Sequence, residues 1–168
     1  MTAITRRFPA EWEKHQATLL SFPSEGRDWP GKYHAVKWAF VEMIKKVTTY
    51  EPVILVVKSD ELREKVAGML EQAHVDPASV SYIIKDTNRN WMRDSGPAIV
   101  KTPNGREAIQ FGFTGWAKYK NHKKDQGTPA AVASHLGLPL VQATYNGKLV
   151  VLEGGSIDVN GCGTLITT

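Results

Sequence analysis

Cysteine is almost absent from this chain of 168 residues, in which Cys162 is the only one. An intramolecular disulfide is therefore excluded, and a reducing compartment such as the cytoplasm is the expected location. No run of about 18 apolar residues is present that could span a membrane. The stretch 1–12 also lacks the apolar segment of a secretion signal. We expect a soluble, cytoplasmic protein with no membrane partner.

A cluster of metal-ligating residues and a large net charge are also missing from the sequence. Only two acidic residues stand in a marked context and no histidine-rich segment lies near them, so we expect neither a metal nor another cofactor. The net charge is only +4, and the densest basic run, 118–124, is closed by Asp125. Since no basic helix continues this run, a solvated loop is favoured over a nucleic-acid interface, and no nucleic-acid partner is expected.

The sequence does have enough apolar residues, 42%, for the core of one domain over 1–168. Apolar residues at helical spacing and short apolar runs between turn signals predict the elements. Helices are predicted over 33–47, 61–73 and 128–136, and strands over 17–22, 53–57, 80–84, 98–100, 108–111, 149–152, 156–159 and 164–167. Strand and helix alternate through the first half of the chain, which indicates an α/β fold.

Two carboxylates, Asp94 and Glu153, stand in similar surroundings. A glycine follows each of them two positions later, and then come a strand, an Asn-Gly turn and a return strand. This repeated unit suggests a pseudosymmetric, propeller-like array in which the acidic residues converge near a common axis. Taken singly, Asp94 could pair with Arg93 and Glu153 with another cation, so the functional interpretation depends on the repetition.

Two convergent carboxylates suit a flat cation. A guanidinium is held best by bidentate carboxylate hydrogen bonds in its plane, with an aromatic ring such as Trp91 or Trp116 against its face. Glycines beside the acids would let a ligand approach the backbone closely. A hard metal ion is less favoured, because it would need more oxygen ligands than these two acids supply.

At these residues the chain resembles the family of agmatine deiminases and bacterial-type peptidyl-arginine deiminases. The matching segments are 9–12 (Pro-Ala-Glu-Trp), 91–97 (Trp-Met-Arg-Asp-Ser-Gly-Pro), 111–119, 152–156 (Leu-Glu-Gly-Gly-Ser) and 163–168. The resemblance implies a pentein-type α/β propeller, of which this chain would be the N-terminal portion, with roughly two of five units. The units would cover approximately 1–100 and 101–168.

The resemblance also implies hydrolysis of a guanidinium to a ureido group and ammonia through a covalent thiouronium intermediate. Agmatine, converted to N-carbamoylputrescine in polyamine metabolism and putrescine biosynthesis, is the favoured substrate, and peptidyl-arginine is the alternative. Asp94 would bind the guanidinium nitrogens, Trp91 would help to line the site, and Glu153 would orient the catalytic histidine. An amidinotransferase on the same fold fits these motifs less well.

The family's catalytic His-x-Asp and cysteine lie further toward the C-terminus, so we expect a chain ending at Thr168 to be inactive alone. His74-Val75-Asp76 precedes the Asp94 motif, and Cys162 follows a turn with no base nearby, so neither is expected to be catalytic. A non-catalytic guanidine-binding or assembly module, complete at 168 residues, is the alternative from another class. Exposed strand edges would favour a homo-oligomer.

Overall fold

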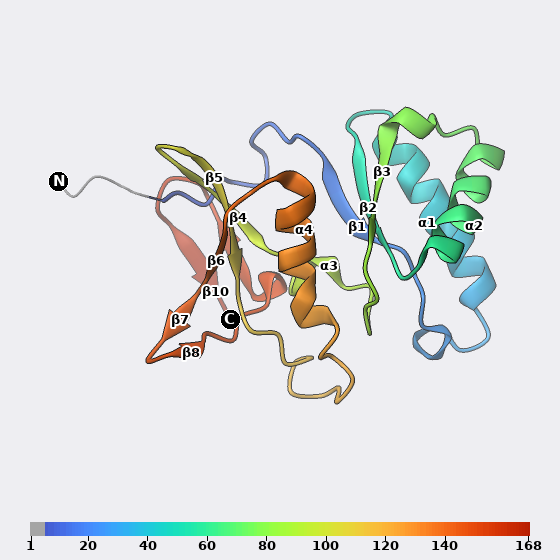
Figure 1. The fold of residues 1–168 in the computed structure, drawn as a ribbon. Coiled ribbons are helices and arrows are strands. Elements are labelled where there is room, and N and C mark those ends of the chain that lie inside the picture. Colours follow the sequence, from blue (N-terminus) through green and yellow to red (C-terminus); the bar gives the residue numbers. More distant parts are fainter. Residues whose placement is uncertain (1–5) are drawn as a thin grey trace. The chain divides into compact units, whose positions relative to one another are not determined.

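The computed structural model describes residues 6–168, which form two compact units (Figure 1). One unit comprises residues 14–92, and the other comprises residues 6–13 together with 93–168. Residues 1–5, which belong to the predicted domain and to the stretch 1–12 that lacks the apolar segment of a secretion signal, lie outside the described part. Within that part, no helix is both long and apolar enough to cross a membrane.

The unit 14–92 is a parallel sheet of three strands covered by two helices. In sheet order, the strands are β1 (Thr18–Ser21), β2 (Val53–Val57) and β3 (Val80–Ile84). The helices α1 (Tyr33–Thr48) and α2 (Asp60–Gln72) connect them and lie on one face of the sheet (Figure 1). Short 3-10 turns are η1 (Gly26–Asp28) and η2 (Pro77–Ser79). The α/β alternation predicted from the sequence is confirmed here.

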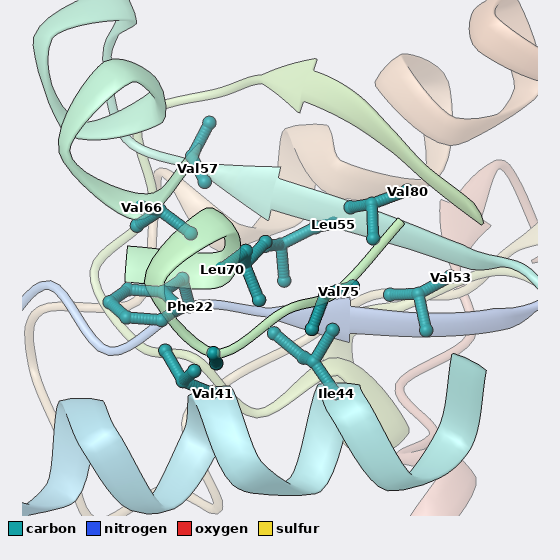
Figure 2. Close-up of a cluster of buried hydrophobic side chains, with 11 residues drawn as sticks. Phe22, Val41, Ile44, Val53, Leu55, Val57, Val66, Leu70, Val75 and Val80 are labelled. Carbon is teal, nitrogen blue, oxygen red and sulfur yellow. The ribbon is translucent and has the colours of Figure 1, made fainter. Parts of the chain in front are cut away.

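An aliphatic core holds this unit together. Figure 2 shows Val41 and Ile44 of α1 and Leu70 of α2 gathered around Leu55 in the central strand. All five residues of β2 are buried, as its uninterrupted apolar run predicted. Each aliphatic side chain moved from water to such a core contributes about 1.5–3 kcal/mol, so this cluster is the main source of the unit's stability.

The second helix of this unit begins at a side-chain cap. The Ser59 hydroxyl accepts a hydrogen bond from the backbone N–H of Leu62 at 3.3 Å, so Ser59 is the N-cap. Asp60 is the first residue of the helix itself.

The other unit is built from hairpins and loops. A mixed sheet contains β4 (Ala98–Thr102), β5 (Gly105–Gln110) and β6 (Leu140–Gln142), with β4 antiparallel and β6 parallel to β5. Helix α4 (Thr128–Leu136) packs against β5 and β6. The remaining elements are α3 (Met92–Ser95), η3 (Asp125–Gly127), β7 (Thr144–Tyr145), β8 (Lys148–Leu149), η4 (Gly154–Ser156), β9 (Ile157–Val159) and β10 (Leu165–Thr167).

The two predicted hairpins are present, and each follows directly on a single helical turn. The hairpin β4–β5 comes after α3 and closes through a tight turn in which Thr102 lies opposite Gly105. The hairpin β9–β10 comes after η4, and its loop 160–164 is longer than the predicted Asn-Gly turn. The Asn160 side chain accepts the backbone N–H groups of Cys162 and Thr164 at 2.8 and 3.1 Å, which stabilises this wider loop.

The prediction of one strand over 149–152 is wrong in its extent. Strand β8 ends at Leu149, and Val151 makes only an isolated parallel bridge with Gly112. The chain leaves the small β7–β8 hairpin here to run beside Gly112. The first part of the apolar run therefore pairs with β7, and the last part lies beside Gly112.

Candidate functional site

Asp94 lies in α3, a helical turn that Gly96-Pro97 brings to an end. Its half-buried carboxylate accepts hydrogen bonds from the backbone N–H of Gly155 and the indole N–H of Trp116. Burial raises the pKa of Asp94, and the two hydrogen bonds and the nearby Arg93 charge act in the opposite direction. The carboxylate is therefore fixed in orientation before any ligand arrives.

The glycines of the Glu-Gly-Gly segment explain how this contact forms. A Cβ atom at position 154 would lie 2.3 Å from the carbonyl oxygen of Arg93, and one at position 155 would lie 2.4 Å from Oδ1 of Asp94. On the side where a Cβ atom would stand, α3 of the same chain fills the space, so these two glycines permit close packing of the two segments. The segments that carry Asp94 and Glu153, predicted to converge, are in direct contact.

Arg93 adds further hydrogen bonds to the contact between α3 and the Glu-Gly-Gly segment. Its Nε donates to the carbonyl of Gly154 at 3.1 Å, and a terminal nitrogen donates to the carbonyl of Ile157 at 3.4 Å. Its charge is balanced by ion pairs with Glu11 and, at 3.6 Å, with Asp158. Arg93 thus binds the Glu153 segment and the N-terminal segment, and is not simply the ion-pair partner of Asp94.

Glu153 occupies the N-cap position of η4. Its backbone carbonyl accepts the N–H and the hydroxyl of Ser156 at 3.0 and 2.7 Å, which fixes its main chain. Its half-buried carboxylate does not cap the turn. The role predicted for this side chain, to orient a histidine, stays a prediction.

The segment 111–119, one of those that carry the family resemblance, holds Trp116 in an unusual backbone conformation. Gly115, Trp116 and Ala117 have φ values of 63°, 58° and 55°, in the left-handed region that a bulky residue rarely adopts. A Cβ atom at Gly115 would lie 2.8 Å from the carbonyl oxygen of Tyr119, so this turn needs glycine. The sharp turn directs the Trp116 side chain toward Asp94.

The Trp116 ring is fixed by neighbours in its own loop. It packs edge-on against the rings of Phe113 and Tyr119, with centroid distances of 5.3 and 5.7 Å. The sequence indicated Trp116 as a possible ring against the face of a guanidinium. It did not reveal that the indole N–H contacts Asp94, although the Gly115 turn was a signal of close packing here.

Two glutamines brace the base of this loop. The side-chain NH₂ of Gln110 donates to the carbonyl of Gln126 at 2.9 Å, and that of Gln126 donates to the carbonyl of Phe113 at 2.8 Å. Beside them, Asp125 is fully buried at the start of η3. None of these three polar residues was singled out as a candidate from the sequence, because their roles depend on the folded loop.

The remaining candidates lie elsewhere. Trp91 is 47% exposed and belongs to the unit 14–92, so its predicted place in the site stays a prediction. His74 follows the C-cap of α2 with a φ of 59°, and Asp76 accepts the backbone N–H of Ala78 at 2.9 Å as the N-cap of η2. Cys162 is exposed in the β9–β10 loop.

Comparison with known proteins places this arrangement in a family. The agmatine deiminase of Pseudomonas aeruginosa (strain LESB58) is 29% identical over 169 residues, which cover 96% of this chain and 43% of that protein. The structure of the agmatine deiminase of Enterococcus faecalis matches with a TM-score of 0.82 at 22% identity, over 97% of this chain and 43% of that one. The structure of C. jejuni agmatine deiminase matches with a TM-score of 0.74 at 24% identity, over 96% and 45%.

The two structural matches show a shared fold, and this chain spans less than half the length of these relatives. The family model described as Porphyromonas-type peptidyl-arginine deiminase matches residues 7–168, which include Asp94, Trp116 and the Glu-Gly-Gly segment. The chain therefore belongs to the family of Porphyromonas-type peptidyl-arginine deiminases.

Proposed function

We propose that this chain forms the part that binds the guanidinium group in a deiminase that hydrolyses agmatine to N-carbamoylputrescine and ammonia. The observation that carries the proposal is the Asp94 carboxylate, half-buried and held by the N–H groups of Gly155 and Trp116. The relatives named agmatine deiminase support this substrate. The family fold favours a pentein-type propeller in which this chain supplies roughly two of five units.

A carboxylate held in this way matches the geometry of a guanidinium. The two N–H donors hold the carboxylate in one plane, and its remaining lone pairs can accept two parallel N–H groups of the ligand. A bound cation lowers the pKa of the neighbouring carboxyl, so substrate binding and ionisation of Asp94 reinforce each other. The partial burial of Asp94 strengthens this attraction relative to water.

In the proposed reaction a cysteine thiolate attacks the guanidinium carbon, ammonia leaves, and water then releases the ureido product from the thiouronium. Asp94 holds the substrate nitrogens, and Glu153 orients the histidine that moves the protons. Because the relatives are more than twice as long, we expect this chain alone to bind the guanidinium without turning it over.

A binding measurement tests the proposal. Agmatine should perturb the NMR signals of the Gly155 amide and the Trp116 indole N–H in the wild-type chain. Asp94→Asn, which keeps the shape and removes the charge, should weaken this binding by about tenfold or more, whereas the control Asp76→Asn should retain it. Undiminished binding by Asp94→Asn, or enzyme-level release of ureido product by this chain alone, would contradict the proposal.

The family description favours peptidyl-arginine as a second candidate substrate. An arginine-containing peptide shares the guanidinium but carries bulk and amide groups at its far end. Titration of such a peptide beside agmatine separates the two, because tighter binding of the peptide would assign the alternative. Binding of both, with no turnover by the protein isolated from its native source, would instead favour a guanidine-binding module.

We also propose that the chain self-associates through β10. Leu165 and Ile166 of this strand are 53% and 69% exposed, and β10 pairs only with β9 within the described residues. An exposed apolar edge strand is a template for pairing with another chain. Light scattering should show a species larger than the monomer, and Ile166→Lys should shift it toward the monomer.

A further inference from the structure

A single peptide unit lies between the charged groups of Arg93 and Asp94. The carbonyl oxygen of Gly154 accepts a hydrogen bond from Nε of Arg93 at 3.1 Å. The N–H of the next residue, Gly155, donates to the carboxylate of Asp94. Because this peptide is planar and trans, its C=O and N–H point in opposite directions. The guanidinium and the carboxylate therefore contact its two opposite ends.

We propose that Arg93 is a positioning residue, which fixes the Asp94 carboxylate through the Gly154–Gly155 peptide. The guanidinium holds the carbonyls of Gly154 and Ile157 together, and this restricts rotation of the peptide plane. A cation at the carbonyl also polarises the peptide, so its N–H becomes a stronger donor to Asp94. The ligand that Asp94 then holds rests on the proposed function, whereas the positioning itself does not.

The residue types along this path fit the role. The guanidinium fork reaches two carbonyls and two carboxylates, of Glu11 and Asp158, which the single ammonium of lysine cannot do with the same geometry. Glycine is required at positions 154 and 155 because any Cβ atom would overlap α3. The arrangement thus depends on contacts that are specific to arginine and glycine.

Arg93→Lys distinguishes the effect of Arg93 through the Gly154–Gly155 peptide from the direct attraction between its charge and that of Asp94. The lysine keeps the positive charge near Asp94 but loses the fork. We expect the Gly155 amide to exchange with solvent about fivefold faster, since a hydrogen bond of this kind is worth about 1 kcal/mol. We also expect the carboxyl carbon of Asp94 to titrate at a higher pH, because a hydrogen bond to its ionised form is weakened. An unchanged Gly155 amide and an unchanged Asp94 titration would overturn the proposal.

A milder variant covers the case in which Arg93→Lys does not fold. Glu11→Gln leaves Arg93 in place and removes one of its ionic partners, so both signals should move in the same direction by a smaller amount. The matched control is Arg63→Lys on α2, an arginine that pairs with Asp60 and Glu64, and it should leave both signals unchanged. If the control moves them as much as Glu11→Gln, the path through the peptide is excluded.

The outcomes distinguish this inference from the proposed function. If agmatine fails to bind but the Gly155 amide responds to Arg93→Lys, the function fails and the positioning stands. If agmatine binds but the Gly155 amide does not respond to Arg93→Lys or Glu11→Gln, the positioning is excluded and the function stands.

Discussion

Each of the two units of this chain is stabilised internally by a different kind of contact. In residues 14–92, aliphatic side chains from α1, α2 and β2 form one continuous core. In residues 6–13 and 93–168, much of the order around the site comes from charged and backbone contacts, such as those of Arg93 with Glu11 and Gly154. Asp94 and Glu153 both belong to this second unit.

This difference shows where precision is needed. A core of interchangeable aliphatic residues tolerates exchange when volume is kept, because apolar contacts have no fixed direction. Hydrogen bonds and ion pairs do have direction, and they can set a carboxylate within a few tenths of an ångström of its required place. We therefore expect substitutions in the first unit to change stability, and those around Asp94 to change binding as well.

The largest effect is expected in the aliphatic core. Leu55→Ala removes a fully buried side chain at the centre of the sheet, and it should lower the free energy of unfolding by about 2–5 kcal/mol. Urea unfolding measures this. The matched control, Leu165→Ala on β10, concerns a side chain that is 53% exposed and should stay within about 0.5 kcal/mol. Equal effects of the two variants would contradict the assignment of the core.

Gly155→Ala should have a smaller effect on stability and a large effect on binding. The added Cβ would lie 2.4 Å from Oδ1 of Asp94, so the carboxylate or the Glu-Gly-Gly segment must shift, at a cost of about 1–3 kcal/mol. Agmatine affinity, measured by calorimetry, should fall more than about tenfold. The control Gly68→Ala adds a Cβ with no atom within 4 Å inside α2, and it should be neutral or stabilising.

The fold of the first unit could be predicted from the sequence because its signals are local. The apolar run 53–57, the periodic helices and the Ser59 cap each reflect the residues at that place. In the second unit, β6 was not predicted, because Leu140–Gln142 is mostly exposed and pairs in parallel with the distant β5. The β7–β8 hairpin was also not predicted, although Asn146-Gly147 is a local signal for its turn.

The site was only partly predictable for the same reason. The repeated carboxylate-glycine pattern indicated that the segments of Asp94 and Glu153 would meet, and they do. The roles of Arg93 and Trp116 depend on contacts between residues far apart in the chain, such as the hydrogen bond of Arg93 to Gly154. No local pattern encodes such contacts, so they required the structure.

Acid should weaken guanidinium binding through Asp94. Because burial raises the pKa of this carboxyl above its ordinary value of 3.8, protonation begins at a higher pH than for an exposed aspartate. The guanidinium itself does not titrate in this range. Agmatine affinity should therefore fall on the order of tenfold as Asp94 protonates. Calorimetric titration over pH measures the fall, and a residual affinity of Asp94→Asn with the same pH dependence would assign it to another group.

The smallest effect is expected at Glu13, whose titration has the opposite sign. Hydrogen bonds from Arg7 and Lys101 hold the pKa of Glu13 far below its ordinary value of 4.5. The stability that Glu13 contributes is thus complete above 4.5 and is lost as the pH falls below it, whereas burial of Asp94 favours the folded state more at low pH. The effect is small because exposed ion pairs are screened by water and salt.

Amide hydrogen exchange can measure, within the second unit, the stability that is lost when Glu13 is protonated. The N–H of Lys101 donates to the carbonyl of Arg7 at 2.8 Å and reports on the attachment of the N-terminal segment. Below the ordinary pKa of Glu13, this amide should lose protection relative to the N–H of Val56 in β2, after correction for the intrinsic pH dependence of exchange. Glu13→Gln should show the loss already at neutral pH. Equal protection of the two amides at all pH values would mean that ionic contacts do not distinguish the two units.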